Sequence, residues 1–378
     1  MDKTFLPSLN LSLPKLGFGC MRLVDDGQGN IETTPALKLL HTALAAGVDY
    51  FDTAYVYHSG KAESFLGKNF FSTLPRNDFM IATKLPVSRI KEAAACEPLF
   101  SEQLANLRVE YIDFYLAHSL NKKSWQRFRD LGGADYLSRL KKEGRVRFVG
   151  FSYHGEPEEL AYVLDDFPWE FVQLQINYYD WPPETQNAQL QYEEVSKRGL
   201  PLLLMEPVRG GSLANLPQAA AELLAAYEPS PNQARWALRW AGSLPEVSMI
   251  LSGMNSEQQL AENLATFSGF TPLTEEERQI VAKLTRFLHQ QPHVDCTGCD
   301  YCKEACPQRI LISSAFEAHN DYLRLNDERI LRNYRLFTPA DRQSMHCTAC
   351  AACSPLCPQG LEIPEKLAVL NNKLATLI

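Results

Sequence analysis

The sequence lacks the long apolar runs and basic patches that would direct a protein to membranes or nucleic acids. No run approaches the ~20 apolar residues of a transmembrane helix, and residues 1–10 have neither the basic nor the apolar segment of a secretory signal. Acidic residues outnumber basic ones by 45 to 37, and the resulting formal net charge of -8 argues against nucleic-acid binding. We therefore expect a cytoplasmic protein with no membrane or nucleic-acid partner.

Cysteine is scarce in the first three quarters of the chain, where only Cys20 and Cys96 occur. All other cysteines lie between Cys296 and Cys357. In a chain of 378 residues without a secretory signal, such crowding indicates metal binding more than disulfides. We expect Cys20 and Cys96 to be buried as small apolar side chains.

Short apolar runs typical of buried strands alternate with helical patterns through the first 250 or so residues. The expected strands are Leu16–Cys20, Tyr50–Asp52, Met80–Thr83, Ile112–Ala117, Val146–Phe151, Phe171–Ile176, Leu202–Met205 and Val247–Leu251. The expected helices include Pro35–Ala46, Lys61–Phe70, Pro157–Leu164 and Thr185–Lys197. Because parallel strands need crossover connections, this α/β pattern favours a (β/α)8 TIM barrel. A doubly wound open sheet is the alternative, although Gly17-Phe18-Gly19 lacks the third glycine of a dinucleotide fingerprint.

The organisation changes after Phe267. A capping-box pattern starts a helix at Thr274 that runs to about His289, and Pro292 follows its end. Beyond it, two cysteine-rich segments flank a helical insert, and a helix closes the chain. We expect a barrel at 1–270, a connecting helix at 271–292 and a small, mainly helical domain at 293–378, with the insert at 313–335 and the last helix at 364–374.

Three consecutive expected strands are followed or ended by titratable side chains. Asp52 ends one strand and Tyr57 follows it by five residues, while Lys84 and His118 end the next two apolar runs. In a parallel barrel the carboxyl ends of the strands share one face, so these four side chains would converge. The Tyr57 phenol could then protonate a carbonyl that receives a hydride from a nicotinamide.

The remaining three residues would support that proton transfer. The Lys84 ammonium would pull the phenol pKa down from about 10, Asp52 would hold the ammonium, and His118 would orient the carbonyl oxygen. Three of these assignments have a simpler structural alternative. Tyr55 could be the acid, His118 could be a core histidine, and Lys84 taken alone could be a surface lysine.

The motifs Asp-x-x-x-x-Tyr, Ala-Thr-Lys and Tyr-Ile-Asp-x-Tyr-x-x-His resemble the aldo-keto reductase family. The likeness covers roughly Leu13 to Phe267 and includes Glu63 and Leu66-Gly67. It implies an NAD(P)H-dependent carbonyl reductase whose catalytic tetrad is Asp52, Tyr57, Lys84 and His118. The family spacing selects Tyr57 over Tyr55 as the general acid.

The resemblance also implies nucleotide contacts in the second half of the barrel. They are Ser152, Gln173, Arg209, Gly210, Gly211, Ser252, Gly253, Gln259 and Asn263. Three positions depart from the family. Tyr153 replaces an asparagine, Met205-Glu206-Pro207 replaces an aromatic residue and a serine before proline, and Asn255 replaces a basic residue that reads the 2′-phosphate. NADP(H) and NAD(H) therefore both stay open, and Arg209 is a candidate partner for the Glu206 carboxylate.

Two copies of one cysteine pattern lie in the last quarter of the chain, Cys-x-x-Cys-x-x-Cys-x-x-x-Cys-Pro. This is the bacterial ferredoxin run, in which the fourth cysteine binds the cluster of the other run. We expect two [4Fe-4S] clusters, one held by Cys296, Cys299, Cys302 and Cys357 and the other by Cys347, Cys350, Cys353 and Cys306. Zinc is the alternative. The long insert is similar to that of helical two-cluster ferredoxin domains.

Three functions fit both halves of the chain. The first is a reductase of a small-molecule carbonyl substrate whose clusters brace the fold or sense redox state. In the second, a flavin or a radical-tolerant substrate links the tetrad to a redox partner protein, because a nicotinamide moves a hydride while a cluster moves single electrons. The third is a non-catalytic electron-transfer subunit, against which the intact tetrad argues.

Overall fold

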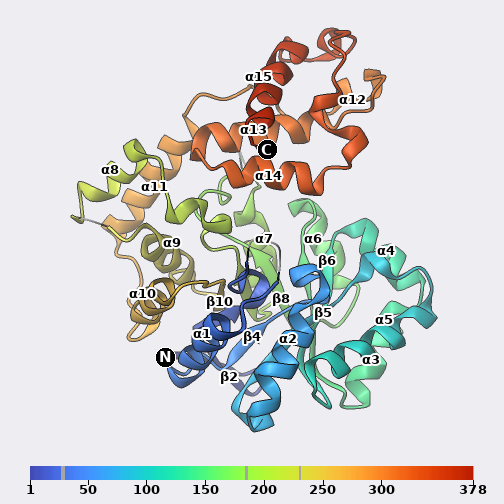
Figure 1. The fold of residues 1–378 in the computed structure, drawn as a ribbon, viewed down its shortest axis with the longest axis vertical. Coiled ribbons are helices and arrows are strands. Elements are labelled where there is room, and N and C mark those ends of the chain that lie inside the picture. The colour runs from blue at the N-terminus through green and yellow to red at the C-terminus, as the bar shows by residue number, and fades with distance from the viewer. Residues whose placement is uncertain (27–29, 184–185, 230, 378) are drawn as a thin grey trace. The chain divides into compact units, whose positions relative to one another are not determined.

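The computed structural model describes residues 1–26, 30–183, 186–229 and 231–377 (Figure 1). The chain forms two compact units. The barrel unit comprises Met1–Gly210 and Ala234–Arg278, and the second unit comprises Gly211–Gln233 and Gln279–Ile378. Within the described residues, no helix has both the length and the apolar character to cross a membrane.

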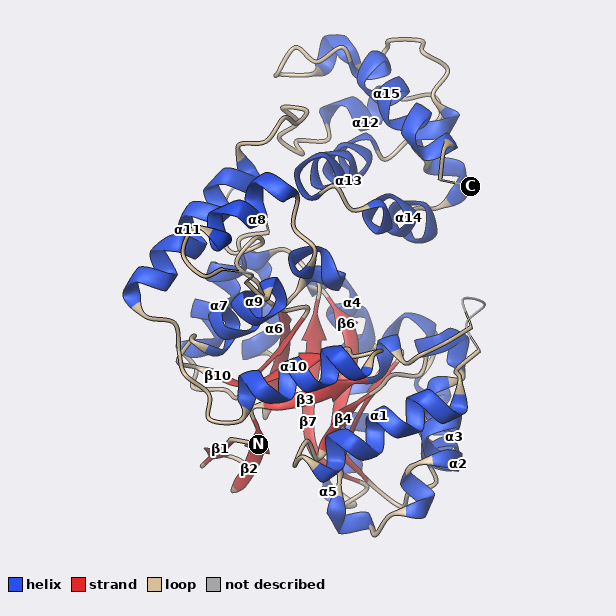
Figure 2. Ribbon diagram, turned by 60° about the vertical axis from the view of Figure 1, so that its left-hand side comes forward, coloured by secondary structure: helices blue, strands red, loops and turns tan. Residues whose placement is uncertain are grey.

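Eight parallel strands close into a barrel in the first unit (Figure 2). They are β3 (Leu16–Gly19), β4 (Tyr50–Asp52), β5 (Met80–Leu85), β6 (Ile112–Leu120), β7 (Val146–Tyr153), β8 (Phe171–Gln175), β9 (Leu202–Met205) and β10 (Val247–Ser252). β10 pairs with both β9 and β3, which completes the ring. The expected TIM barrel is confirmed, with strand ends that differ by up to three residues from those expected. The open-sheet alternative is wrong because the sheet has no edge.

The helices of this unit follow the strands in the alternation that the sequence predicts. They are α1 (Thr33–Ala45), α2 (Ala62–Asn69), α3 (Cys96–Leu107), α4 (Lys122–Asp130), α5 (Gly133–Lys142), α6 (Leu160–Asp165), α7 (Ala188–Ser196), α9 (Gln233–Gly242) and α10 (Glu257–Phe267). Gln233 itself belongs to the second unit. The helix expected at Thr185–Lys197 is α7, and Thr185 lies outside the described residues.

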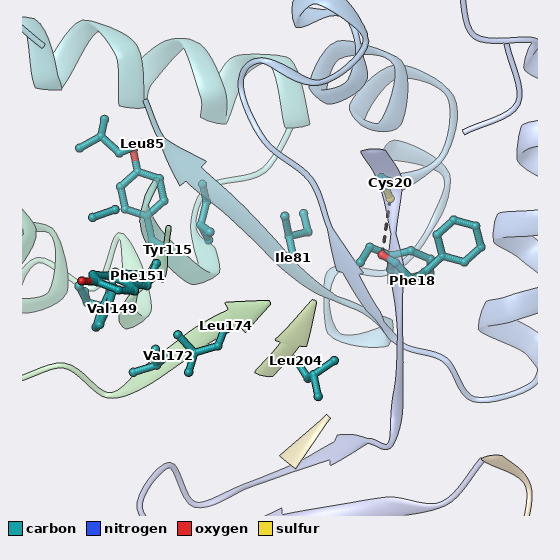
Figure 3. Packing of buried hydrophobic residues seen from close by; sticks show 14 of the residues in the cluster. Phe18, Cys20, Ile81, Leu85, Tyr115, Val149, Phe151, Val172, Leu174 and Leu204 are labelled. Atoms are coloured by element: carbon teal, nitrogen blue, oxygen red, sulfur yellow. Dashed lines mark hydrogen bonds between the residues drawn. The ribbon is translucent and has the colours of Figure 1, made fainter. Parts of the chain in front are cut away.

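The barrel has one apolar layer inside the strands and another between strands and helices. Side chains such as Ile81, Tyr115 and Leu174 point outward from three different strands into the second layer, part of which Figure 3 shows. Cys20 and Cys96 are buried there, as expected. Burial of such apolar area is the main stabilising contribution to a fold of this kind.

A hairpin that the sequence reasoning did not anticipate closes the floor of the barrel. Its strands are β1 (Lys3–Leu6) and β2 (Leu11–Pro14), paired antiparallel. Leu6, Leu9 and Leu13 join the interior cluster of barrel side chains that includes Tyr50 and Phe114. The floor is therefore sealed by apolar side chains, and polar groups in the barrel gather at the opposite, carboxyl ends of the strands.

The described residues of the second unit form helices and loops and no strand. Its helices are α8 (Gln218–Ala225), α12 (Tyr301–Ala305), α13 (Ile312–Leu325), α14 (Glu328–Phe337) and α15 (Ile363–Ala375). The expected helical insert is two helices, because Asn326 takes a left-handed conformation and the Asp327 side chain caps α14 by accepting the Arg329 N–H at 3.0 Å. The mainly helical character expected for the end of the chain is confirmed.

One long helix, α11 (Glu275–His289), contains the border between the units. Its expected capping box is present, since the Thr274 N–H donates to Glu277 at 2.8 Å and the Glu277 N–H donates to the Thr274 hydroxyl at 3.2 Å. Arg239 clamps the same carboxylate with two bonds of 2.6 and 2.8 Å. The domain boundaries expected at 270 and 292 stay predictions.

Candidate functional site

Three adjacent strands deliver the expected catalytic residues to one end of the barrel. Asp52 is the last residue of β4, Lys84 lies one residue before the end of β5, and His118 lies near the end of β6. Asp52 stands opposite Ala82, and Lys84 opposite Leu116, in the parallel register. Tyr57 begins the short helical turn that follows β4. Parallel pairing therefore brings residues far apart in sequence to the same carboxyl-end face.

The Lys84 ammonium is the centre of this group. It donates to Asp52 Oδ1 at 2.5 Å and to the Thr53 carbonyl at 2.8 Å. Its Nζ also lies 3.3 Å from the Tyr57 hydroxyl. Lys84 and Asp52 are only 1% and 4% exposed, so the ammonium and carboxylate depend on each other for charge compensation. Gln173 Nε2 donates to the second carboxylate oxygen at 3.0 Å.

The Tyr57 and His118 rings face each other across the group, with centroids 6.3 Å apart and planes at 79°. Burial lowers the pKa of His118 to about 3, and the Lys84 charge acts in the same direction. His118 is therefore neutral at pH 7 and has one N–H to donate. The side chain is half-buried, which is unlike the enclosed core histidine considered as an alternative.

The phenol of Tyr57 differs from the expectation in one respect. Burial raises its pKa above the ordinary value, and this effect outweighs the opposing influence of the Lys84 ammonium. The expectation that Lys84 lowers the Tyr57 pKa toward neutrality is therefore wrong for the protein without bound ligands. Burial also opposes the charged form of Lys84, but Asp52 and Tyr57 together raise the Lys84 pKa more. Both groups carry their protons at neutral pH.

Tyr55 has a different environment from Tyr57. Its hydroxyl donates to Glu102 Oε2 at 3.0 Å, and its ring lies against the Arg89 guanidinium. Tyr57 is therefore the tyrosine that contacts Lys84.

A buried polar network that the sequence did not predict contacts the backbone of β5 at Lys84. Gln103 on α3 donates to the Lys84 carbonyl at 3.1 Å and to Glu63 Oε1 at 2.8 Å. The Thr83 hydroxyl donates to the same Glu63 oxygen at 2.5 Å, and Tyr115 donates to Gln103 at 2.8 Å. Burial raises the pKa of Glu63 to about 7. Nothing in the sequence pairs Gln103 with β5, because the contact depends on how α3 packs.

Most residues expected to bind the nucleotide lie at the same end of the barrel. Ser152 ends β7 with Tyr153, and its hydroxyl accepts the Ser119 N–H at 2.8 Å. Ser252 ends β10 and accepts from Asn263 at 3.0 Å, and both are buried. Gln259 accepts the Asn255 N–H at 2.9 Å. The structure thus places Ser152 and Ser252 at the ends of two strands and Gln259 and Asn263 on the helix after β10, while ligand contacts stay predictions.

The loop after β9 has different ion pairs from those the sequence suggested. Arg209 donates to Asp180 Oδ1 at 3.0 Å and lies over the Tyr179 ring. The Glu206 carboxylate accepts the Gly210 N–H, and Arg22, after β3, lies 3.9 Å from it. Arg22 was not among the expected site residues, although a basic residue directly after a barrel strand could have signalled it. Gly211 belongs to the second unit.

The eight clustered cysteines line two pockets in the second unit. Cys296, Cys299, Cys302 and Cys357 line a pocket of about 330 Å³. Cys306, Cys347, Cys350 and Cys353 line another of about 310 Å³. Each pocket combines three cysteines of one run with the fourth of the other, the same division that the ferredoxin pattern predicts. Ile312 borders both pockets.

The donor set of these pockets suits an iron–sulfur cluster. A structural zinc site can also use four thiolates, but two Cys-x-x-Cys-x-x-Cys-x-x-x-Cys-Pro runs that exchange their fourth cysteines are typical of ferredoxin clusters. Within the described residues, no three His, Cys, Asp or Glu side chains form a group that could hold a single metal ion. Burial raises the pKa of Cys302 to about 11, so bound iron would have to favour its thiolate form.

Comparisons with known proteins agree with this division of the chain. A family model described as the Aldo/keto reductase family matches residues 15–286. A second model, described as a 4Fe-4S dicluster domain, matches residues 295–362. The L-galactose dehydrogenase of Arabidopsis thaliana is 26% identical over 280 residues, which cover 69% of this chain and 86% of that protein. The uncharacterized oxidoreductase YqkF of Bacillus subtilis is 24% identical over 331 residues, which cover 76% of this chain and 97% of that protein. The holo structure of aldo-keto reductase AKR11C1 from Bacillus halodurans superimposes with a TM-score of 0.63 at 26% identity, covering 75% of this chain and 96% of that one.

Glu63 generates a prediction about pH and stability. Its folded pKa of about 7 exceeds the ordinary 4.5, so the folded state holds the extra proton between these values and stability falls as the pH rises through that window. From about pH 5.5 to about pH 8.5 we expect wild type to lose about 2 kcal/mol relative to Glu63→Gln. Thermal unfolding of both proteins at the two pH values measures this difference.

Glu110→Gln is the matched control, because it removes an exposed carboxylate from the loop between α3 and β6. It should keep the wild-type dependence on pH. A constant stability difference between wild type and Glu63→Gln across the range would show that Glu63 titrates like an ordinary carboxyl group.

Proposed function

This chain belongs to the aldo/keto reductase family of oxidoreductases, and from that premise we propose that it reduces a carbonyl substrate with a hydride from NADPH or NADH. The observation that carries the proposal is the position of the Lys84 ammonium, which contacts both the Asp52 carboxylate and the Tyr57 hydroxyl. In this arrangement Tyr57 can donate a proton, the Lys84 charge can stabilise the resulting phenolate, and Asp52 holds Lys84 in place.

A nicotinamide held at this end of the barrel would supply a hydride to the carbonyl carbon. As negative charge develops on the substrate oxygen, Tyr57 donates its proton to that oxygen and becomes a phenolate. Lys84 stabilises the phenolate, and Asp52 keeps Lys84 charged and in place. The neutral His118 donates its N–H to the same substrate oxygen and orients it. The product is the alcohol.

The nucleotide contacts belong to the same proposal. Buried Ser152 and Gln173 would face the nicotinamide end, and Arg209, Gly210, Gly211, Ser252, Gly253, Gln259 and Asn263 would face the rest of the dinucleotide. At position 255 an asparagine offers no positive charge for a 2′-phosphate, so NADH is as suitable as NADPH.

The second half of the proposal is that the two cysteine pockets each hold one [4Fe-4S] cluster. The 4Fe-4S dicluster domain match and the four cysteines around each pocket support this. We further propose domains at 1–270, 271–292 and 293–378 and a cytoplasmic location. Because hydride transfer moves two electrons and a cubane moves one, we assign the clusters a bracing or sensing role. A redox partner protein is the alternative that the dicluster domain keeps open.

Tyr57→Phe tests the proton donor. We expect kcat for NADPH-dependent reduction of 4-nitrobenzaldehyde, or of any better carbonyl substrate found in a panel of aldehydes, ketones and aldoses, to fall by about 10²–10⁴-fold. NADPH affinity should change little, because the missing hydroxyl acts on the substrate. Tyr55→Phe is the matched control and should retain wild-type kcat. Equal losses in both variants, or none in Tyr57→Phe, would contradict the assignment.

Anaerobic titration tests what the clusters do. We expect NADPH or NADH to bind to the cluster-loaded protein, seen by nicotinamide fluorescence, without bleaching of the cluster absorbance, because a hydride donor does not readily reduce a one-electron acceptor. Bleaching of the cluster absorbance that requires added flavin would instead favour the alternative function, in which a redox partner protein exchanges electrons with the barrel through the clusters.

Paired cysteine variants test which residues share a cluster. If Cys296 and Cys357 hold the same cluster, Cys296→Ser with Cys357→Ser should damage one cluster and leave about four iron atoms per chain. Cys296→Ser with Cys306→Ser, both in the first run, should damage both clusters and leave almost no iron. Iron content and electron paramagnetic resonance after anaerobic reconstitution measure this. The reverse pattern would mean that each run holds its own cluster.

A further inference from the structure

The two cysteine pockets are related by an internal repeat that extends beyond the cysteines. Gln308 and Ile312 recur as Gln359 and Ile363, at the same offset in sequence as the two cysteine runs. Gln359 lines the first pocket, defined by Cys296, Cys299, Cys302 and Cys357. Its counterpart Gln308 lines the second pocket, defined by Cys306, Cys347, Cys350 and Cys353. The pockets are therefore equivalent sites, each built from exchanged halves of the same repeat.

The backbone takes the same path through the two cysteine loops. Gly298 and Asp300 in the first run have φ of 69° and 59°, and their counterparts Ala349 and Ala351 in the second run have φ of 55° and 59°. Left-handed backbone is uncommon for residues other than glycine. Its recurrence at matching positions shows that the loops differ in their side chains and not in their shape.

One difference between the side chains is a charge. Asp300 lines the first pocket, whereas Ala351 lines the second pocket at the equivalent position. Among the described residues that line the second pocket, none has a charged side chain. A second polar difference is Ser313, which lines the first pocket and has Pro364 as its counterpart.

Two contacts hold the Asp300 carboxylate at the first pocket. The hydroxyl of Ser313, at the start of α13, donates to one carboxylate oxygen. The Lys303 ammonium lies 3.4 Å from the other oxygen, and both side chains of this ion pair are 42% exposed. Water therefore weakens the compensation that the ammonium provides. Of the two charges, the carboxylate is the one that lines the pocket.

We propose that the clusters of the two pockets differ in reduction potential, with the cluster beside Asp300 the lower of the two. The first electron to reach this domain then resides in the second pocket. Each cluster takes one electron from a one-electron donor, such as a reduced iron–sulfur protein or flavoprotein, and no bond forms or breaks. A negative charge beside a cluster repels the added electron and so favours the oxidised form.

This inference rests on the proposed function in one respect, the presence of a [4Fe-4S] cluster in each pocket. It assigns separate tasks to the two clusters. Because Ile312 borders both pockets, the clusters would be neighbours, and an electron could settle on the one of higher potential. The second cluster would set the potential at which the domain first responds, and the first would respond only under more reducing conditions.

The test is an anaerobic potentiometric titration of the full, cluster-loaded chain, followed by electron paramagnetic resonance. Asp300→Asn removes the charge and keeps an oxygen that can accept from Ser313. At a fixed potential it should raise the ratio of reduced to oxidised first cluster about tenfold, equivalent to about 59 mV for a one-electron couple. Ala351→Asp should lower this ratio about tenfold for the second cluster, and aspartate tolerates the left-handed backbone there.

Three further variants make these measurements specific. Cys299→Ser removes a ligand of the first pocket only, and Cys350→Ser removes one of the second pocket only, so they assign each resonance signal to a pocket. Asp341→Asn is the matched control, because it removes the same charge from an exposed residue that lines neither pocket. It should leave both potentials unchanged.

The possible failures are distinguishable. Reduction of the first cluster before the second in wild type would overturn the inference, as would an unchanged potential of the affected cluster in Asp300→Asn or Ala351→Asp. In these cases the iron content of about eight atoms per chain still supports two [4Fe-4S] clusters. A reconstituted chain without iron–sulfur absorbance would instead overturn the cluster assignment, and the inference with it.

Discussion

The buried contact between Lys84 and Asp52 is the constraint on which the site depends. Removing an ammonium or a carboxylate from water is unfavourable by several kcal/mol per ion, and only close mutual pairing with further hydrogen bonds offsets this. Lys84 satisfies its donors on Asp52, Thr53 and Tyr57, and Gln173 occupies the second oxygen of Asp52. The geometry of the tyrosine therefore follows from an electrostatic requirement that any folded form of this chain must meet.

That requirement explains why part of the site was predictable from the sequence. Asp52, Lys84 and His118 stand at or near the ends of consecutive apolar runs, and parallel strands in a barrel bring such ends together whatever the helices do. The cysteine division was predictable because both runs match the bacterial ferredoxin pattern, in which the fourth cysteine binds the cluster of the other run. The closed barrel followed from the alternation of strands and helices.

Other features depend on packing that no local pattern encodes. Gln103 reaches Glu63 and the Lys84 carbonyl only because α3 lies against the end of β5. Arg22 meets Glu206 because β3, β10 and β9 are neighbours in the closed ring. The pKa of Tyr57 depends on how completely the chain desolvates the phenol, and the sequence shows only the ammonium that opposes this effect. The hairpin floor is too short to stand out from the apolar background.

The division of cysteines between the two pockets has a consequence for biosynthesis. Each pocket needs residues from both sides of the α13 and α14 insert, so neither can be completed while the ribosome is still making that segment. The barrel strands are all translated before the first cysteine run emerges. Completion of either pocket would therefore be a late step, made on a chain whose barrel strands have already been synthesised.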